Sequence, residues 1–229
     1  MRVAIHQPNF LPWSGYFHKI SQVEKFVFLD DVQLERGKSF TQRSKILIEN
    51  TEKWITVPIV NKGENTLIRD ARIDDSVIWK RKLLKTIELN YKRTPGFEEI
   101  FPILQLILNS TSKFLVDYNI PFICKISHFL GFETEFTLSS DLNIPLSAHG
   151  KDKIIGINKV LNADTYLSGR GAGSMRYIDP ADFTYAGINL EWQEYAVKEY
   201  PQGTNRPFVP GLSIVDLIFN CGRSSKEYL

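Results

Sequence analysis

The chain has 229 residues, of which 43% are hydrophobic and 24% charged, with a formal net charge of +2. This is ordinary globular composition, which excludes a disordered or coiled-coil chain. The charges are well mixed rather than gathered in the basic block typical of a nucleic-acid-binding protein, so we expect no nucleic-acid partner. Two cysteines, Cys124 and Cys221, are too few for a disulfide framework or a paired set of metal ligands, so we expect no metal site.

The first residues lack the apolar core of a secretory signal, and no apolar run approaches the ~20 residues that span a bilayer. We therefore expect a cytoplasmic protein with no membrane span. The length favours one domain over residues 1–229.

The N-terminal segment has the pattern of a βαβ unit. Residues 3–5 form a short apolar run that ends in a polar loop. Trp13, Tyr16, Phe17 and Ile20 then recur at helical spacing, and residues 25–29 form a second apolar run. A strand, a helix and a strand in this order predict parallel pairing.

The middle of the chain is predicted to be mainly helical. Strands are expected over residues 54–60, with Pro58 at an edge, and over residues 67–73. Helices are predicted over residues 76–91 with Ser76 as the N-cap, over residues 97–118, and over residues 121–130 with Gly131 as the C-cap. A helical section of about 76–131 therefore separates two α/β-like ends.

The C-terminal part returns to alternating elements: a helix over 151–161, a strand over 165–167, a short helix that opens at Asp179-Pro180 and ends at Gly187, a strand over 188–195, and a helix over 213–219 capped by Ser213. The predicted fold is α/β and three-layered, with a mainly parallel sheet and a helical middle section.

The strongest candidate site follows the first predicted strand. His6 stands where ligands bind in open α/β sheets, and its ordinary pKa suits general acid or base work. Gln7 and Asn9 add hydrogen-bonding groups that can orient a carbonyl or hydroxyl. The alternative is that His6 only caps the strand.

A second candidate follows the next predicted strand, at Asp30 and Asp31, with Gln33 close behind. Two adjacent parallel strands place His6 and one of these carboxylates at the same sheet edge. The carboxylate there can orient the imidazole, raise its basicity, or hold a divalent cation or sugar hydroxyls. The alternative is a solvated turn.

Two further segments suit anions. Arg43 can pair with phosphate in a bidentate manner, although surface solubility explains it equally well. The run Ser168-Gly169-Arg170-Gly171-Ala172-Gly173, followed by Tyr177, can present backbone N–H groups to phosphate or an oxyanion. Its spacing fits neither the Walker loop nor the dinucleotide fingerprint.

Cys221 is a possible nucleophile if a neighbour lowers its pKa, although a packing role is more common for such a residue. Trp13 and Tyr16 suit stacking on sugar rings or packing in the core. His149 is a lesser site candidate, and we interpret Cys124 and His128, one helical turn apart, as structural.

Several of these segments together resemble the WbqC-like protein family. The resemblance rests on Ala4-Ile5-His6-Gln7-Pro8-Asn9-Phe10-Leu11-Pro12-Trp13, Gly15-Tyr16-Phe17, Val27-Phe28-Leu29-Asp30-Asp31-Val32-Gln33, Gln42-Arg43, Trp54-Ile55-Thr56-Val57-Pro58, Leu167-Ser168-Gly169, Tyr177-Ile178-Asp179 and Leu212-Ser213-Ile214-Val215-Asp216-Leu217-Ile218-Phe219-Asn220-Cys221-Gly222. Ser44 stands where the family tends to have asparagine, and Lys153 where arginine is expected.

The resemblance implies a bacterial protein associated with O-antigen and other surface polysaccharides, which transfers glycine or another acyl group to a sugar. On this hypothesis His6 is the general base that Asp30 or Asp31 orients. The acceptor is a nucleotide-linked amino sugar, and the donor is an acyl or aminoacyl thioester on a carrier protein or coenzyme A. The residues expected to bind substrate are Gln7, Asn9, Trp13, Gln33, Arg43, Ser168, Gly169, Arg170 and Tyr177.

Two alternatives remain open at this point. A nucleotidyl- or adenylate-handling enzyme fits a His-containing loop between a strand and a short helix, although His18 lies too far along to be the second histidine of such a motif. A non-enzymatic sugar-binding module fits the aromatic content of 12%.

Overall fold

The computed structural model describes residues 1–35, 37, 39–60, 63, 65–76, 78–145, 148–203 and 207–229. The chain divides into two compact units. We call Met1–Gln7, His18–Asp31 and Phe132–Tyr195 the sheet unit, and Pro8–Phe17, Val32–Gly131 and Ala196–Leu229 the helical unit. Helix α1 (Ser14–Ser21) contributes its first half to the helical unit and its second half to the sheet unit.

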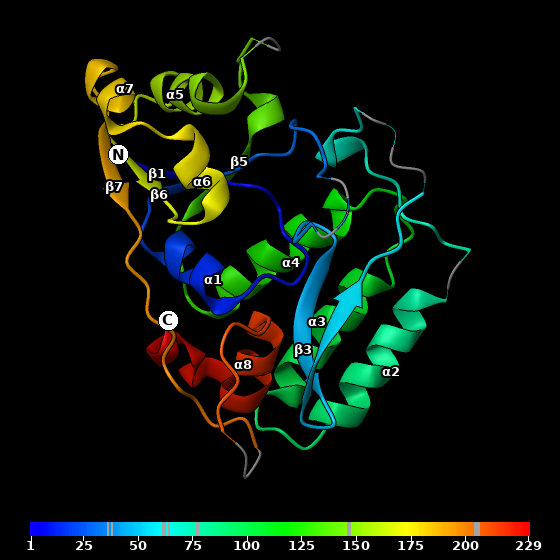
Figure 1. The fold of residues 1–229 in the computed structure, drawn as a ribbon. Helices are drawn as coiled ribbons and strands as arrows, with labels where there is room; N and C mark the ends of the chain where they lie inside the picture. Colours follow the sequence, from blue (N-terminus) through cyan, green and yellow to red (C-terminus); the bar gives the residue numbers. More distant parts are fainter. Residues whose placement is uncertain are drawn as a thin grey trace. The chain divides into compact units, whose positions relative to one another are not determined.

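The sheet unit contains five strands and several helices. In chain order they are β1 (Arg2–His6), the second half of α1, β2 (Lys25–Phe28), β5 (Glu135–Leu138), the 3-10 turn η2 (Ser139–Asp141), α5 (Gly150–Val160), β6 (Thr165–Ser168), α6 (Ala172–Tyr177), α7 (Pro180–Tyr185) and β7 (Asn189–Trp192). Figure 1 shows these elements along the chain.

The five strands form one sheet in the order β5-β2-β1-β6-β7, and every neighbouring pair is parallel. Helices flank this sheet, so the predicted α/β class with a mainly parallel sheet is confirmed. The predicted N-terminal βαβ unit is confirmed too, because β1 and β2 pair in parallel with Ala4 opposite Phe26.

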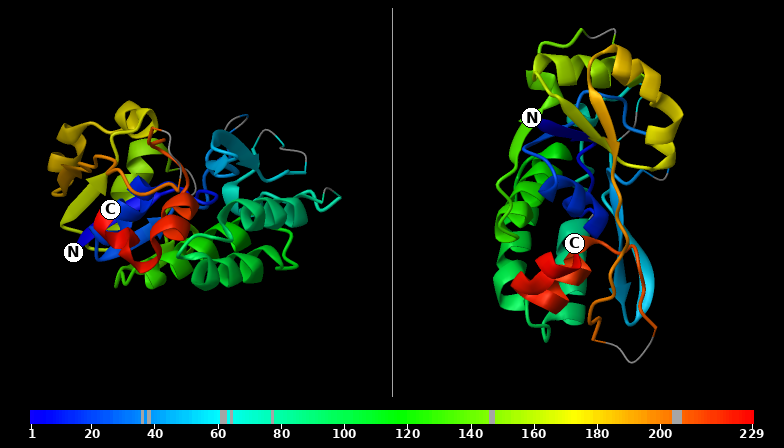
Figure 2. Two further views of the ribbon diagram at one scale, coloured as in Figure 1. Left: turned by 90° about the horizontal axis from the view of Figure 1, so that it is seen from below. Right: turned by 90° about the vertical axis from the view of Figure 1, so that its left-hand side faces the viewer.

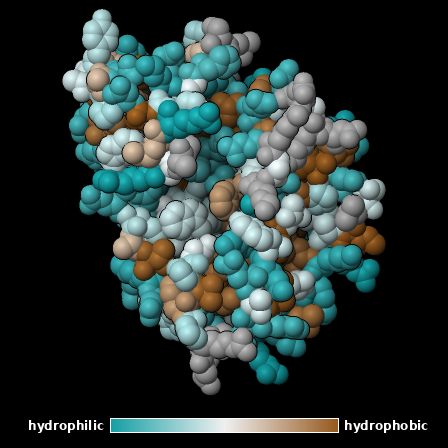
Figure 3. Space-filling model, in the orientation of Figure 1, coloured by the Kyte–Doolittle hydropathy of each residue, from teal (hydrophilic) through white to brown (hydrophobic). Residues whose placement is uncertain are grey.

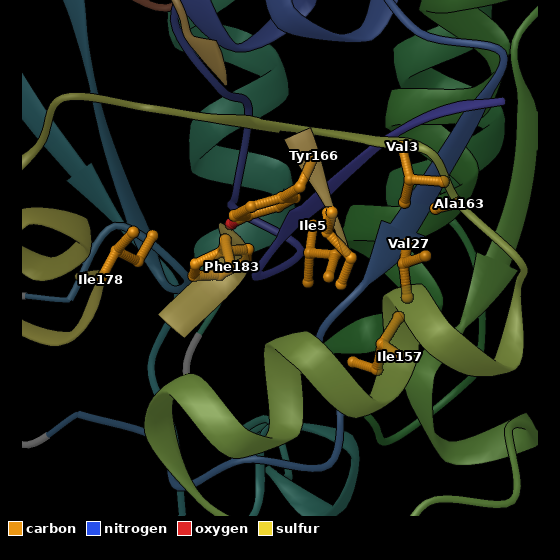
Figure 4. Close-up of a cluster of buried hydrophobic side chains, with 9 residues drawn as sticks. Val3, Ile5, Val27, Ile157, Ala163, Tyr166, Ile178 and Phe183 are labelled. Atoms are coloured by element: carbon orange, nitrogen blue, oxygen red, sulfur yellow. The ribbon is translucent and has the colours of Figure 1, made fainter. Parts of the chain in front are cut away.

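One face of the sheet is buried under α5 and α7. Val3 and Ile5 of β1, Val27 of β2 and Tyr166 of β6 belong to the same buried cluster as Ile157 of α5 and Phe183 of α7 (Figure 4). The ring of Phe183 stacks on that of Tyr166, with centroids 5.4 Å apart. The period-two alternation of strand side chains explains why the odd-numbered residues of β1 share this face.

Aromatic rings pack on β2 and on the edge strand β5. Phe26 and Phe28 of β2 and Phe136 of β5 form an aromatic cluster, in which Phe28 and Phe136 stack with centroids 5.4 Å apart. Both rings of β2 are fully buried. Their burial removes a large apolar area from water and stabilises the pairing of β2 with β5.

The helical unit combines a β-hairpin with helices. Its elements after the first half of α1 are β3 (Arg43–Ile48), β4 (Thr51–Thr56), the 3-10 turn η1 (Ile68–Asp70), α2 (Trp79–Tyr91), α3 (Phe97–Leu108), α4 (Val116–Phe129), α8 (Ile214–Cys221) and the 3-10 segment η3 (Gly222–Tyr228). Strands β3 and β4 pair in antiparallel fashion, and Figure 2 shows α2, α3 and α4 side by side, where α3 contacts both α2 and α4.

Several predicted boundaries in this unit are wrong. The strand expected over residues 67–73 is the 3-10 turn η1 with isolated bridges around it. The strand expected over residues 54–60 starts earlier and ends at Thr56. Strand β3 was not predicted at all.

The predicted central helices are present with different limits. The helix expected over residues 97–118 breaks after Leu108, and α4 begins at Val116 and carries Pro121 inside it. The hydroxyl of Ser112 accepts a hydrogen bond from the N–H of Phe114, so this serine offers the backbone an alternative to the helix. Ser76 does not cap α2 but donates to Asp74. Within the described residues, no helix is both long and apolar enough to cross a bilayer.

The packing of Gly96 against α8 leaves no room for a side chain. The Gly96 N–H donates to the Phe219 carbonyl at 2.8 Å, and a Cβ on Gly96 would lie 2.1 Å from the Ile218 carbonyl oxygen. We predict that Gly96→Ala lowers the free energy of unfolding by about 2–4 kcal/mol, because backbone must move to relieve the overlap. Thermal and urea denaturation measure the change.

The control is Gly156→Ala inside α5, where the added Cβ would meet only Ile144 at ordinary contact distances of 3.6 and 3.7 Å. Alanine should stabilise that helix by about 0.5–1 kcal/mol. Equal effects of the two substitutions would contradict the assignment of Gly96 as a steric requirement.

Candidate active site

The parallel sheet changes its direction of growth between β1 and β6. The chain builds from β1 to β2 and β5 on one side, and then returns to place β6 and β7 on the other. In open α/β sheets, ligands bind beyond the carboxyl ends of the strands at such a switch point. Ala4 lies opposite Leu167, and the same register carried two residues further brings His6 level with Gly169. The loops that follow β1 and β6 therefore lie next to each other.

His6 ends β1 with a defined ring orientation. Its Nδ1 lies 3.0 Å from the carbonyl oxygen of Gln7, which can only accept, so Nδ1 carries the proton and Nε2 is the acceptor nitrogen of the ring. Burial, together with the positive charge of Lys19, lowers the pKa of His6 to about 3, although the Gln7 carbonyl acts in the opposite direction. The imidazole is therefore neutral at physiological pH.

Lys19 supplies a buried positive charge beside this ring. It lies in the last turn of α1 and is 3% exposed. Burial lowers its pKa to about 7. Among the described residues no carboxylate forms an ion pair with it, which is unusual for a buried lysine.

The Lys19 ammonium reaches the glycine turn after β6. Its Nζ lies 3.7 Å from the position that a Cβ on Gly169 would take. Helical side chains point toward the N-terminus of their helix, which here is the direction of the carboxyl edge of β1. An uncompensated cation beside a glycine backbone is suited to a phosphate or a carboxylate of a ligand.

The end of β7 adds polar groups near the same turn. The Gln193 N–H donates to the Ser168 carbonyl at 2.7 Å, and its side-chain oxygen lies 4.0 Å from the Cβ position of Gly169. The side-chain nitrogen of Gln193 lies 3.0 Å from Nδ1 of His18, whose ring packs on Tyr195. Ser168 is fully buried and donates to the Gly169 carbonyl.

Asp30 ties β2 to β5. One of its carboxylate oxygens accepts from the Ser139 hydroxyl and the Ser140 N–H, both at 3.0 Å, and the other accepts from the Ser140 hydroxyl at 2.7 Å. The residue is 3% exposed. These contacts give Asp30 a structural role at the edge of the sheet. Its carboxylate accepts hydrogen bonds from the hydroxyl and N–H groups at the start of η2.

Asp31 forms an ion pair with Lys153 of α5 at 2.6 Å, and both side chains are more than nine-tenths buried. Its other oxygen shares the single proton of the Ser139 hydroxyl with Asp30. Burial alone would raise the Asp31 pKa, but the contacts with Lys153 and Ser139 lower it overall. The carboxylates of both aspartates are engaged by Ser139, Ser140 and Lys153, and their predicted part in orienting His6 stays a prediction.

The remaining predicted site residues of the sheet unit lie at its surface. Arg170 faces Glu194 at 3.6 Å, with both side chains exposed. Tyr177 is 50% exposed, lies 3.5 Å from the Cβ position of Gly150, and has the Arg176 guanidinium 5.5 Å from its ring centroid. His149 precedes α5 without capping it through its side chain.

Four predicted binding residues belong to the helical unit. Asn9 is 7% exposed, and the preceding carbonyl, that of Pro8, accepts from the buried side chain of Asn119 at 2.8 Å. Trp13 is 40% exposed, and its indole covers Gly15, where a Cβ would lie 2.4 Å from the ring. Gln33 is exposed and forms an isolated bridge with Leu67.

Arg43, the fourth of them, stacks its guanidinium on Trp54, 3.9 Å from the ring centroid. Phe40 packs beside the same indole, and both aromatic side chains are exposed by more than two-fifths. Cys221 ends α8, where burial, Asp216 and Glu227 raise the pKa of its thiol to about 11. A thiol with this pKa stays protonated at neutral pH, which disfavours the nucleophile hypothesis.

Sequence reasoning missed Lys19, Gln193, Ser139 and Ser140. A buried lysine on a short amphipathic helix is indistinguishable in sequence from a solvated one. Strand β5 was not predicted, and Ser139 and Ser140 begin η2 directly after it. The available signal for Lys19 was its spacing of three residues from Tyr16, which places it near the apolar face of the helix. Within the described part of the chain, no three histidine, cysteine or acidic side chains gather as metal ligands would.

Breaking the Asp31–Lys153 pair should be costly. We predict that Lys153→Met lowers the free energy of unfolding by about 3–5 kcal/mol, because a buried carboxylate loses its cation. The pKa of Asp31 is lowered in the fold, so its contribution is present above the ordinary carboxyl pKa and is lost as pH falls through the lowered value. Denaturation at neutral and acidic pH tests this, and Asp31→Leu combined with Lys153→Met should recover most of the loss.

Removing the Lys19 charge should instead stabilise the fold. The pKa of Lys19 falls from 10.5 to about 7, so the energetic penalty for its charge is complete below about pH 7 and disappears as pH rises toward 10.5. We predict that Lys19→Met raises the free energy of unfolding by about 1–4 kcal/mol near pH 6, with a smaller gain at high pH. Destabilisation at every pH would show that the ammonium is compensated in the fold.

The family model and a relative both match nearly the whole chain. The model of the WbqC-like protein family matches residues 7–228. The chain is 32% identical over 232 residues to the uncharacterised protein Rv1507c of Mycobacterium tuberculosis, in an alignment that covers 100% of this chain and 97% of that protein. No solved structure matches the chain. The match to the family model spans His6's neighbour Gln7, the aspartate pair, the glycine turn and the C-terminal helix alike, and the chain belongs to the WbqC-like protein family.

Proposed function

We propose that this protein transfers an acyl or aminoacyl group to a nucleotide-linked amino sugar in the assembly of a bacterial surface polysaccharide such as O-antigen. The observation that carries the proposal is the buried cation Lys19 beside His6 and Gly169 at the switch point of the sheet. Such switch points bind nucleotides in many α/β proteins, and membership of the WbqC-like family supports the polysaccharide setting.

In the proposed reaction, Lys19 and the backbone at Gly169 hold the phosphate of the acceptor. An anion on Lys19 offsets the charge that helps to lower the His6 pKa, so binding of the acceptor raises the basicity of Nε2. Substrate binding thereby prepares the base. Asp30 and Asp31 support the loop after β2. The substrate-binding roles expected of Arg43, Trp13, Gln33 and Asn9 stay predictions.

The chemical step is acyl transfer from a thioester on a carrier protein or coenzyme A. The neutral amine of the sugar attacks the thioester carbonyl, a C–N bond forms and the C–S bond breaks. His6 Nε2 accepts the proton lost by the amine and returns it to the departing thiolate. The Gln7 amide is suited to polarise the carbonyl oxygen as negative charge develops there.

The strand order also favours a second candidate, an enzyme that handles nucleotides or adenylates. If the five parallel strands are numbered by their order along the chain, the sheet order is 3-2-1-4-5. Dinucleotide-binding sheets share this order. A triphosphate would satisfy Lys19 as well as a nucleotide sugar does. The two candidates differ in the ligand that stabilises the protein.

The test is a transfer assay with amino-sugar nucleotides and acyl or glycyl thioesters, read by mass spectrometry. We predict that wild-type protein forms an amide product, that His6→Gln lowers kcat by about 100-fold or more because the base is lost, and that Lys19→Met mainly raises KM for the nucleotide sugar. The variant Lys151→Gln, whose exposed side chain pairs with Asp182, is the matched control for loss of one lysine charge.

A thermal-shift screen separates the alternatives. Stabilisation by nucleoside triphosphates but not by nucleotide sugars would favour the second candidate. Sugar binding without product, unchanged in His6→Asn, would favour a binding module. Absence of transfer across the whole panel, with His6→Gln binding every ligand as wild type does, would contradict the proposed reaction.

A further inference from the structure

The helical unit contains a polar cavity that the proposed reaction does not use. It has a volume of about 250 Å³ and lies between the β3–β4 turn, the end of α2, the segment around Gln202 and α8. This volume is below the range of about 300–1,000 Å³ typical of drug-sized ligands, so an occupant must be small. The polar residues Asn90, Thr94 and Asn220 line it, which suits a polar ligand.

Asp216 is the charged group in the wall of this cavity. The residue is 1% exposed. Its carboxylate accepts hydrogen bonds from the Tyr91 hydroxyl at 2.7 Å, the Tyr200 hydroxyl at 2.8 Å and the Gln202 side-chain nitrogen at 3.4 Å. All three donors are neutral, and among the described residues no lysine, arginine or histidine forms an ion pair with Asp216.

The neutral donors do not fully offset the cost of burying this charge. Burial raises the pKa of Asp216, and the three hydrogen bonds reduce that rise without cancelling it. A buried carboxylate gains most from a positive charge that approaches it directly. The space for such a charge is present, because Asp216 itself lines the cavity.

We propose that this cavity binds a small hydroxylated compound through its primary ammonium group, which donates to Asp216. An ammonium offers three donors and no acceptor, which matches a carboxylate surrounded by hydroxyl and amide groups. Asn90 and Asn220 line the cavity, and their amide nitrogens, which each donate one hydrogen bond to a backbone carbonyl, keep a second N–H for a hydroxyl group of the ligand. The proposal is independent of the reaction assigned to the sheet unit.

Two charged residues of opposite sign line the same cavity. Glu49 and Arg93 both belong to its wall, and Arg93 is exposed. If the ligand is a cation, Glu49 attracts it and Arg93 repels it. A neutral ligand would respond to neither charge. These surface positions therefore report on the charge of the ligand with little risk to folding.

The experiment is isothermal titration calorimetry with matched pairs that differ at one group, glucosamine against glucose and ethanolamine against ethylene glycol, at a pH where the amines are protonated. At least one amine should bind at least about tenfold more tightly than its neutral partner. Asp216→Asn should remove this preference. Glu49→Gln should weaken binding of the amine about twofold, and Arg93→Gln should strengthen it by a similar factor.

Every outcome decides the proposal. If no amine binds more tightly than its neutral partner, or if a folded Asp216→Asn protein keeps the preference, the proposal is overturned. If Asp216→Asn does not fold, as judged by circular dichroism, the pair Glu49→Gln and Arg93→Gln decides. Shifts of opposite sign support a cationic ligand, and equal or absent shifts overturn it.

Discussion

The position of β1 between β2 and β6 is the constraint on which the candidate site depends. Backbone hydrogen bonds to both neighbours fix the register, so His6 at the end of β1 comes level with a glycine turn more than 160 residues later in the chain. A slip of one residue would turn Val3 and Ile5 away from the buried face. The hydrophobic core therefore determines where the polar groups of the site lie.

Two buried lysines in the sheet unit show how differently one charge can be used. Lys153 is matched by Asp31 and connects α5 to the end of β2, so its charge serves the fold. Lys19 has no carboxylate partner among the described residues, and its lowered pKa records the cost. A fold can keep an unfavourable buried charge where a ligand of opposite charge offsets it. The difference between Lys153 and Lys19 therefore favours a functional role for Lys19.

Much of this arrangement could be predicted from the sequence. The apolar runs at residues 3–5 and 25–29 and the polar residues after them correctly indicated a parallel βαβ unit with His6 and the aspartates at one edge. The strand order could not be predicted, because β5 and β6 lie far along the chain and pairing between distant strands leaves no local signal. Nor could the partners of Asp31, since Lys153 reaches it only through the packing of α5. The face in Figure 3 does not mark the site by its hydropathy, because hydrophobic and hydrophilic residues are interspersed on it.

Because residue 169 is a glycine, a single substitution there can block the Lys19 ammonium. Nζ of Lys19 lies 3.7 Å from the Cβ position of residue 169, so an acidic side chain there would form an ion pair with the ammonium. We expect such a variant to keep its fold and become more stable, because an internal carboxylate would take the place that we propose for the substrate phosphate. A glycine at this position thus leaves the ammonium without an internal carboxylate partner in the described part of the chain, and aspartate or glutamate there should abolish the proposed transfer while stabilising the fold.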